Sequence, residues 1–453
     1  MTSELWASAV EVLRENDLGG WTKPAPKLYP HQWSWDSAFI AIGLVHVDPS
    51  RAVRELETLF GAQWADGRVP HIVFNNNDET PKEDYFPDPG WWASQKFSPP
   101  APAHTPTSGL VQPPVHAIAA WHVAQVAGDT VRDRLRELYP RLFAWHRYLV
   151  SHRDLDGRGL IVVYHPWESM DNSPRFDAAL ARVEVGDLPP YKRRDTGHIQ
   201  DKSQRPTDAE YDRFLWLVNL MKACQYDDTA IQRTLPLLVQ DVFFSGILAA
   251  ANHALSQLAG WLGVDSDRQQ LDEWSMHFSN AVQQQWDATE RLALDYDVRA
   301  DAPIRVQTIA GFAPLLVPGL ESRLRDKLLS ELFGPRFVHA EGFKFPVIPS
   351  TAPGSPGFQR RSYWRGPVWP VMNWLFWWGL RQQDEEARAE ELRQANLQLL
   401  LEPTSRFAEY LEPYTGEPLG SMDQSWTAAV ALDWLARDHV RGYADLATRP
   451  ERH

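Results

Sequence analysis

The 453-residue chain is poor in residues that build covalent or metal-held frameworks. It has a single cysteine, Cys224, so no disulfide can form within it. It has no cysteine cluster, no His-Glu-x-x-His zinc motif and no Gly-x-Ser-x-Gly turn, the motif that carries the nucleophile of many serine hydrolases. The sequence therefore predicts neither a metal site nor a bound cofactor.

Positive charge and long apolar runs are also scarce. Lys and Arg number 45 against 59 Asp and Glu, a formal net charge of −14, which argues against nucleic acid and anionic membrane surfaces as partners. The longest apolar run, 369–380, is shorter than a membrane span and contains Pro370 and Asn373. Residues 1–18 have the pattern of an amphipathic helix without the basic and apolar regions of a signal peptide. We expect a cytoplasmic protein.

Strand signals are confined to two short segments, 159–164 and 291–296, whereas apolar residues recur at helical spacing through most of the chain. About a dozen helices without a repeat period favour paired helices closed into a toroid, an all-α (α/α)6 barrel, over an α-solenoid. No linker divides residues 1–453, so one catalytic domain is expected. The predicted helices are 4–17, 35–45, 50–64, 113–127, 130–152, 207–226, 242–262, 266–286, 306–317, 322–332, 369–383, 385–401 and 424–437.

Two long loops interrupt the helical pattern. Residues 75–108 are rich in proline and aromatic residues, and residues 186–204 carry a cluster of Lys and Arg. Loops of this length within a compact domain are usually functional. We interpret both as lids over a binding site, and the basic one could offer positive charge to an anionic substrate.

Tryptophan is the residue in clear excess, with 21 copies. Its ring stacks on the C–H face of a sugar, and its N–H can still donate a hydrogen bond. Two aromatic blocks, residues 29–36 (YPHQWSWD) and 363–370 (YWRGPVWP), fall at the entrances of predicted helices and not in their middles. In a toroid, such loops form the rim of the substrate cleft. The aromatic composition therefore indicates a sugar-binding cleft.

Candidate acids lie in two other blocks. Residues 164–175 (YHPWESMDNSPR) place Glu168 and Asp171 three residues apart beside Trp167. An apolar ring next to a carboxyl group favours its protonated form, as acid catalysis on a sugar requires. Residues 407–420 offer three candidates for the second carboxylate of a glycosidase. Spacing alone separates neither Glu168 from Asp171 nor the members of the second set, Glu409, Glu412 and Glu417.

Five blocks in this order resemble the bacterial glycoside hydrolase family 63 enzymes that cleave mannosylglycerate and glucosylglycerate. The resemblance spans nearly the whole chain and implies an (α/α)6 barrel with an inverting mechanism. It places the general acid at Asp171, whose pKa we expect to be raised by burial beside Trp167, and the general base at Glu409. Glu168 then becomes a neighbour that orients the sugar or tunes Asp171. The five blocks are 29–36, 108–114 (SGLVQPP), 167–174, 363–370 and 407–410 (FAEY).

The resemblance also implies a substrate-binding set. A cation is needed for the glycerate carboxylate, and Arg205 suits it because a guanidinium can bind both oxygens at once. The other expected glycerate contacts are Tyr85, Tyr211 and Gln424. The expected sugar contacts are Tyr29, Trp33, Trp35, Asp36, Gln112, Trp167, Trp364 and Trp369.

The predicted reaction is hydrolysis of the α-glycosidic bond of a glycoside of glycerate, and the sequence does not choose between the glucosyl and mannosyl forms. An α-glucosidase or trehalase-like hydrolase of a neutral disaccharide is the main alternative, against which Arg205 and the basic loop argue. A sugar epimerase on the same barrel, or a non-catalytic sugar-binding protein, would leave the Asp171 and Glu409 blocks unexplained. The oligomeric state is left open, a homo-oligomer included.

Overall fold

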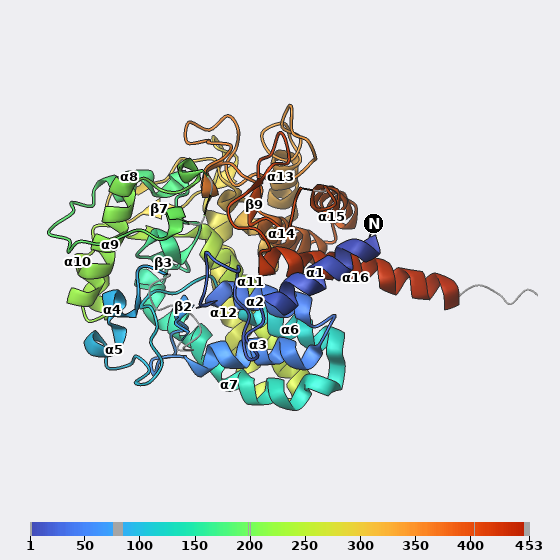
Figure 1. Cartoon of the computed structure of the whole chain (residues 1–453), viewed down its shortest axis with the longest axis horizontal. Coiled ribbons are helices and arrows are strands. Elements are labelled where there is room, and N and C mark those ends of the chain that lie inside the picture. The colour runs from blue at the N-terminus through green and yellow to red at the C-terminus, as the bar shows by residue number, and fades with distance from the viewer. Residues whose placement is uncertain (1, 76–84, 198, 200, 403, 448–453) are drawn as a thin grey trace, which may run out of the picture.

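Six helical elements form a closed inner ring in the computed structural model, which describes residues 2–75, 85–197, 199, 201–402 and 404–447. Each element packs against the next along the chain, and the last packs against the first. Figure 1 shows these two, red and blue, side by side. This closure distinguishes a toroid from a solenoid. The inner elements are α2 (Ser34–Leu44), α6 (His116–Ala127), α11 (Val242–Leu262), the 3-10 helix η9 (Ile309–Leu316), α14 (Pro370–Gln382) and α16 (Ser425–Ala447).

Six further helices surround this ring, each packed on one or two inner elements. The result is the double ring of an (α/α)6 barrel, so the predicted fold class is confirmed. The outer helices are α1 (Thr2–Glu15) against α16, α3 (Pro49–Gly61) against α2 and α6, α7 (Arg132–Tyr148) against α6 and α11, α12 (Arg268–Gln284) against α11, α13 (Ser322–Leu332) against η9, and α15 (Glu386–Leu400) against α14 and α16.

The residue patterns explain which helices are inner and which are outer. Every residue of α2 is buried, as expected of a helix covered on all sides, whereas α12 buries only one stripe. The structure differs from the prediction over 306–317, where a 3-10 helix replaces the expected α-helix. Pro314 lies within that segment and lacks the N–H that an α-helical hydrogen bond would need.

Short segments at the rim carry the remaining structure. The strands are all two residues long, and the pairing of β1 with β2 (Gln32↔Val73) fixes the chain where it enters α2. The first predicted lid contains two short helices, and residues 76–84 of it lie outside the described part. The remaining strands and α-helices are β1 (Gln32–Trp33), β2 (Ile72–Val73), α4 (Pro89–Trp92), α5 (Ser94–Phe97), β3 (Val162–Val163), α8 (Asp177–Ala181), α9 (Asp208–Ala223), α10 (Asp228–Thr234), β4 (Val239–Gln240), β5 (Trp286–Asp287), β6 (Leu292–Ala293), β7 (Tyr296–Asp297), β8 (Ala302–Pro303), β9 (Tyr410–Leu411) and β10 (Pro418–Leu419).

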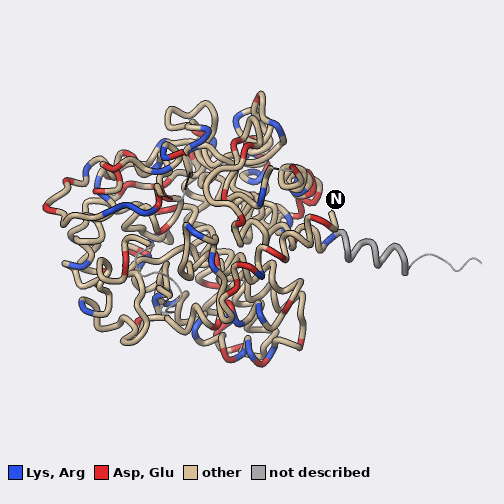
Figure 2. The backbone as a smooth tube through the Cα atoms, viewed as in Figure 1, with Lys and Arg blue, Asp and Glu red and all other residues tan. Residues whose placement is uncertain are grey.

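Among the described residues, α11 is the one helix whose length and composition would suit a membrane span. It lies in the inner ring, and 89% of its most apolar window is buried inside the protein, so its apolar character is that of a core helix. Lys and Arg residues are interspersed with Asp and Glu along the chain (Figure 2).

Candidate active site

A pocket opens where several inner helices begin. Trp35 and Asp36 lie in the first turn of α2, Gln112 precedes α6, Trp364 precedes α14, and Gln424 directly precedes α16. The aromatic blocks at helix entrances therefore line one cleft, as the sequence predicted. The full lining is Leu28, Tyr29, Trp33, Trp35, Asp36, His71, Tyr85, Phe86, Gln112, Trp167, Ser169, Asp171, Arg194, Asp195, Arg205, Pro206, Tyr211, Tyr363, Trp364, Glu409, Gln424 and Trp426.

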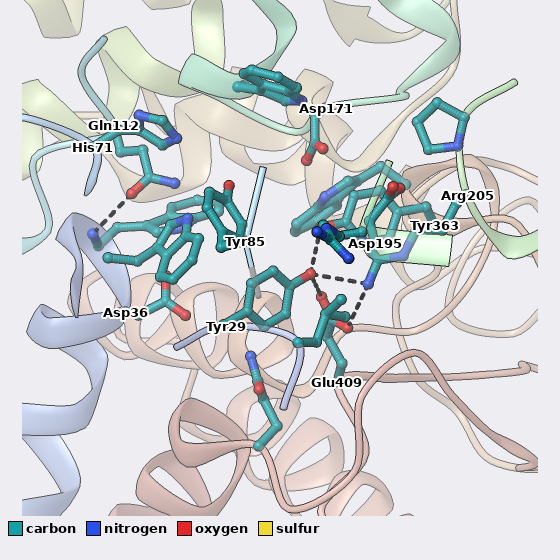
Figure 3. Close-up of a pocket in the computed structure, with 18 of the residues that line it drawn as sticks. Tyr29, Asp36, His71, Tyr85, Gln112, Asp171, Asp195, Arg205, Tyr363 and Glu409 are labelled. Carbon is teal, nitrogen blue, oxygen red and sulfur yellow. Dashed lines mark hydrogen bonds and ion pairs between the residues drawn. The ribbon is translucent and has the colours of Figure 1, made fainter. Parts of the chain in front are cut away.

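Asp171 and Glu409 point into this pocket from opposite sides, Asp171 from the top of the view and Glu409 from the bottom (Figure 3). Asp171 lies in the turn between two 3-10 helices, η4 (Pro166–Glu168) and η5 (Pro174–Phe176). Burial raises the pKa of Asp171 to about 7, against the opposing effect of Arg205. The expected rise is confirmed, and it leaves a carboxyl group that can hold a proton near neutral pH.

Glu409 lies directly before β9 and is 1% exposed. The Tyr29 hydroxyl donates to its Oε1 at 2.7 Å, and the Ser421 backbone N–H and the Arg205 Nη2 donate to its Oε2 at 3.0 and 3.3 Å. Because all these groups donate, Glu409 serves as an acceptor on both oxygens. The glycine at position 420 allows Glu409 to lie this close to the 420–421 backbone, since a Cβ on Gly420 would lie 2.6 Å from Oε2.

Arg205 is buried in the pocket beside Glu409, at the end of the second predicted lid. Its Nη2 also donates to the Tyr29 hydroxyl at 3.0 Å, and its guanidinium lies 4.4 Å from the centre of the Tyr363 ring. Its Nε is buried without a hydrogen-bond partner. The pocket thus contains a desolvated cation with donor capacity left over, which is what an anionic ligand would need.

Aromatic rings form the walls. Tyr29 and Tyr85 both pack edge-on against Trp33, with ring centres 5.1 and 5.2 Å away. Trp369 is a correction to the prediction: it stacks behind Trp364 at 3.7 Å with nearly parallel rings and does not line the pocket. It supports the wall that Trp364 presents. Every other predicted substrate-binding residue lines the pocket.

Two polar side chains lie at the α2 end of the pocket. Burial, with a smaller effect of the Glu409 charge, raises the pKa of Asp36 well above its ordinary value. Gln112 accepts a hydrogen bond from the Trp35 backbone N–H at 3.3 Å, which fixes its amide. A protonated carboxyl and an oriented amide can both donate to sugar hydroxyls.

Glu168 is the second correction. It lies outside the pocket lining, fully buried, and pairs with Arg153 through both of its oxygens at 2.8 and 3.0 Å. The backbone N–H groups of Val111 and Tyr164 also donate to it. Glu168 therefore holds the segment leading to Asp171 in place and contacts no ligand in this pocket.

The other two glutamates of the second block also have structural partners. Glu412 accepts the backbone N–H groups of Tyr414 and Thr415, which shapes a turn. Glu417 pairs with Arg361 at the surface. Of the three candidates that spacing left open, only Glu409 faces the pocket.

Sequence reasoning missed several lining residues. Tyr363 opens the second aromatic block and touches both Arg205 and Tyr29, yet sugar stacking alone favours the tryptophans that follow it. Arg194 and Asp195 come from the second lid, whose basic character predicts charge at the site but not its positions. Ser421 holds Glu409 from behind the lining; it follows a Gly in a turn and carries no signal of its own.

A double ring of helices whose rim carries two opposed carboxyl groups in an aromatic pocket defines a glycoside hydrolase of the (α/α)6 class. Residues 29–427 match the model of the mannosylglycerate hydrolase MGH1-like glycoside hydrolase domain. The chain belongs to this family.

The names of similar proteins agree with this assignment. A glucosylglycerate hydrolase of Mycolicibacterium hassiacum is 46% identical, over 96% of this chain and 98% of that protein. A mannosylglycerate hydrolase of Thermus thermophilus is 41% identical, over 94% of this chain and 99% of that protein. The crystal structure of a Thermus thermophilus GH63 mannosylglycerate hydrolase in complex with Tris and D-glycerate superposes with a TM-score of 0.86, covering 95% of this chain and 99% of that one, at 41% identity. Neutral trehalase Nth1 of Saccharomyces cerevisiae, at 13% identity and a TM-score of 0.57, shares the fold.

Proposed function

We propose that this protein hydrolyses the α-glycosidic bond of a glycoside of glycerate: 2-O-α-D-glucosyl-D-glycerate, mannosylglycerate or both. The observation that carries the proposal is the buried Arg205 in an aromatic pocket beside Glu409. Glu409 is one anionic partner of this guanidinium, and the carboxylate of glycerate would supply a second for its unpaired Nε, which a neutral disaccharide would not. The names of the relatives and the D-glycerate bound in the Thermus thermophilus enzyme support the same substrate class.

The mechanism we propose is single-step inversion. Asp171, protonated near neutral pH, donates its proton to the glycosidic oxygen as the bond to the anomeric carbon breaks. Glu409 removes a proton from a water that attacks the same carbon from the opposite face. The donors from Tyr29 and Ser421 hold the Glu409 carboxylate in one orientation, so that its free lone pairs face the pocket.

Release of free sugar measures the proposed hydrolysis directly. Purified protein is incubated with glucosylglycerate, mannosylglycerate and trehalose, and free hexose is quantified. The proposal expects turnover of at least one glycerate glycoside and slow or no turnover of trehalose, and preferred hydrolysis of trehalose would refute it. Proton NMR during the first minutes then tests inversion: an α-linked glucoside must release β-glucose first.

The role of Arg205 needs a comparison of substrates, because this side chain also touches Glu409. Arg205→Ala is expected to lower kcat for every substrate and, in addition, to raise KM for glucosylglycerate more than for a neutral α-glucoside. Arg194→Ala is the matched control, a second cation in the lining for which the described residues offer no ion pair. An equal rise in KM for charged and neutral substrates in Arg205→Ala would refute the glycerate contact.

A further inference from the structure

Two histidines and an aspartate converge at the far end of the barrel from the active site. His46 follows the C-terminal end of α2, about 15 Å from the end that carries Trp35. His122 lies on α6 and Asp433 on α16, so the three side chains come from three consecutive elements of the inner ring. The Nε2 atoms of His46 and His122 lie 2.8 and 2.9 Å from the same oxygen, Asp433 Oδ1.

The geometry points to a binding site for a divalent transition metal, zinc above all, held by His46 Nε2, His122 Nε2 and Asp433 Oδ1. Neutral imidazoles and a carboxylate form a ligand set typical of Zn²⁺. The three candidate ligand atoms lie within 4.8 Å of one another. With metal–ligand distances of about 2.0–2.2 Å, tetrahedral ligands stand roughly 3.3 Å apart. A small opening of the observed contacts would admit the ion.

The two imidazoles differ, because His46 Nε2 has a hydrogen bond to Asp433 and His122 Nε2 does not. Its Nε2 is buried and 2.9 Å from Asp433 Oδ1, yet it has no partner with hydrogen-bond geometry. A nitrogen that donated to the carboxylate would align with that oxygen. The Nε2 of His122 is not aligned in this way, which leaves its lone pair available to an ion bound between the three ligands.

The surroundings are those of an organised metal site. The other carboxylate oxygen, Asp433 Oδ2, accepts a hydrogen bond from the Trp374 indole N–H at 2.8 Å, which leaves Oδ1 alone for both imidazoles. Such outer contacts orient metal ligands. The helices are also fixed closely, because a Cβ on Gly43 of α2 would lie 2.4 Å from the Cα of Ala429 on α16.

A groove of about 480 Å³ adjoins the cluster and gives an ion a path of entry and space for water as a fourth ligand. Arg381 and Arg437 also line the groove. Both approach Glu386, and both guanidinium groups lie over the Trp377 ring, so their charge is shared with an acidic partner and does not stand alone beside the cluster. A metal here would join α2, α6 and α16, independently of the reaction at the other end.

The test is zinc binding to untagged protein stripped of metal by a chelator and followed by isothermal titration calorimetry. The proposal expects one Zn²⁺ per chain, loss of that binding in His122→Ala, and a zinc-dependent rise in Tm in the parent protein that His122→Ala lacks. His277→Ala is the matched control, since His277 pairs with Asp154 at 2.8 Å without a second imidazole. It should keep full binding.

Circular dichroism of the metal-free variants shows whether they fold, and His46→Ala replaces His122→Ala if the latter does not. Absence of zinc binding in the parent protein would overturn the proposal and leave a plain His–Asp–His cluster. Undiminished binding in both ligand variants would overturn it as well.

Discussion

Replacing Glu168 should lower the stability of the fold, whereas replacing Asp171, three residues further on, should lower activity. Glu168→Gln keeps the shape of the side chain but removes the charge that faces Arg153 in a fully buried site. Breaking one partner of a buried ion pair costs about 3–5 kcal/mol. Asp228 also approaches Arg153, at 2.9 Å, so we expect the lower end of this range, about 3 kcal/mol.

Asp171→Asn should cost activity and not stability. Loss of a general acid lowers kcat by roughly 10²–10⁴-fold. The pKa of Asp171 is about 7 in the folded protein and close to 3.8 when unfolded, so between these pH values the unfolded state binds fewer protons. Stability therefore falls as pH rises through this window. A neutral Asn avoids that loss, so at pH 8 the variant should unfold at the parent midpoint or above it.

Urea unfolding at pH 5 and pH 8, together with glycerate-glycoside hydrolysis at saturating substrate, measures both effects. The parent protein should lose stability between the two pH values more steeply than Asp171→Asn does. An inactive Glu168→Gln that unfolds at the parent midpoint would contradict the structural role of Glu168. Near-normal kcat in Asp171→Asn would contradict the assignment of the acid.

Three further outcomes follow from the site and the ring. The alkaline limb of kcat/KM should fall through a pKa of about 7 as Asp171 loses its proton, and Trp364→Phe should move this limb upward, since hydrogen bonding from Trp364 lowers that pKa; a pH–rate series in both proteins measures the shift. Gly420→Ala should lower kcat at least tenfold in the hydrolysis assay, because the added Cβ displaces Glu409. Gly43→Ala should leave KM unchanged and destabilise the fold by about 1–3 kcal/mol in urea unfolding, because it pushes α2 from α16.

Much of the helical architecture can be predicted from local sequence patterns. The range predicted for α11 matches the observed helix at both ends, and α9 begins after a Thr207–Glu210 capping box that is visible in the sequence. Strand signals at 159–164 and 291–296 correctly predicted β3 and β6, whereas β1 and β2 had no such signal, because their pairing joins segments far apart, as Gln32 and Val73 are. Periodicity over 306–317 predicted a helix correctly but could not specify its 3-10 form.

The active site also combines features that local sequence predicts with features that depend on distant contacts. Trp364 and Trp369 share one motif and one residue type, yet one lines the pocket and the other stacks behind it. The difference is set by where α14 begins: Trp369 is its N-cap residue and packs inward against Tyr410, a contact that no local pattern encodes.

The His46–His122–Asp433 cluster lies beyond local pattern for the same reason. Its members stand 76 and 311 residues apart in the sequence, and zinc motifs are recognised by short spacings. Only closure of the inner ring brings α2, α6 and α16 together. A closed toroid places residues from the first and last inner helices side by side, so this cluster depends on contacts that join the two ends of the chain.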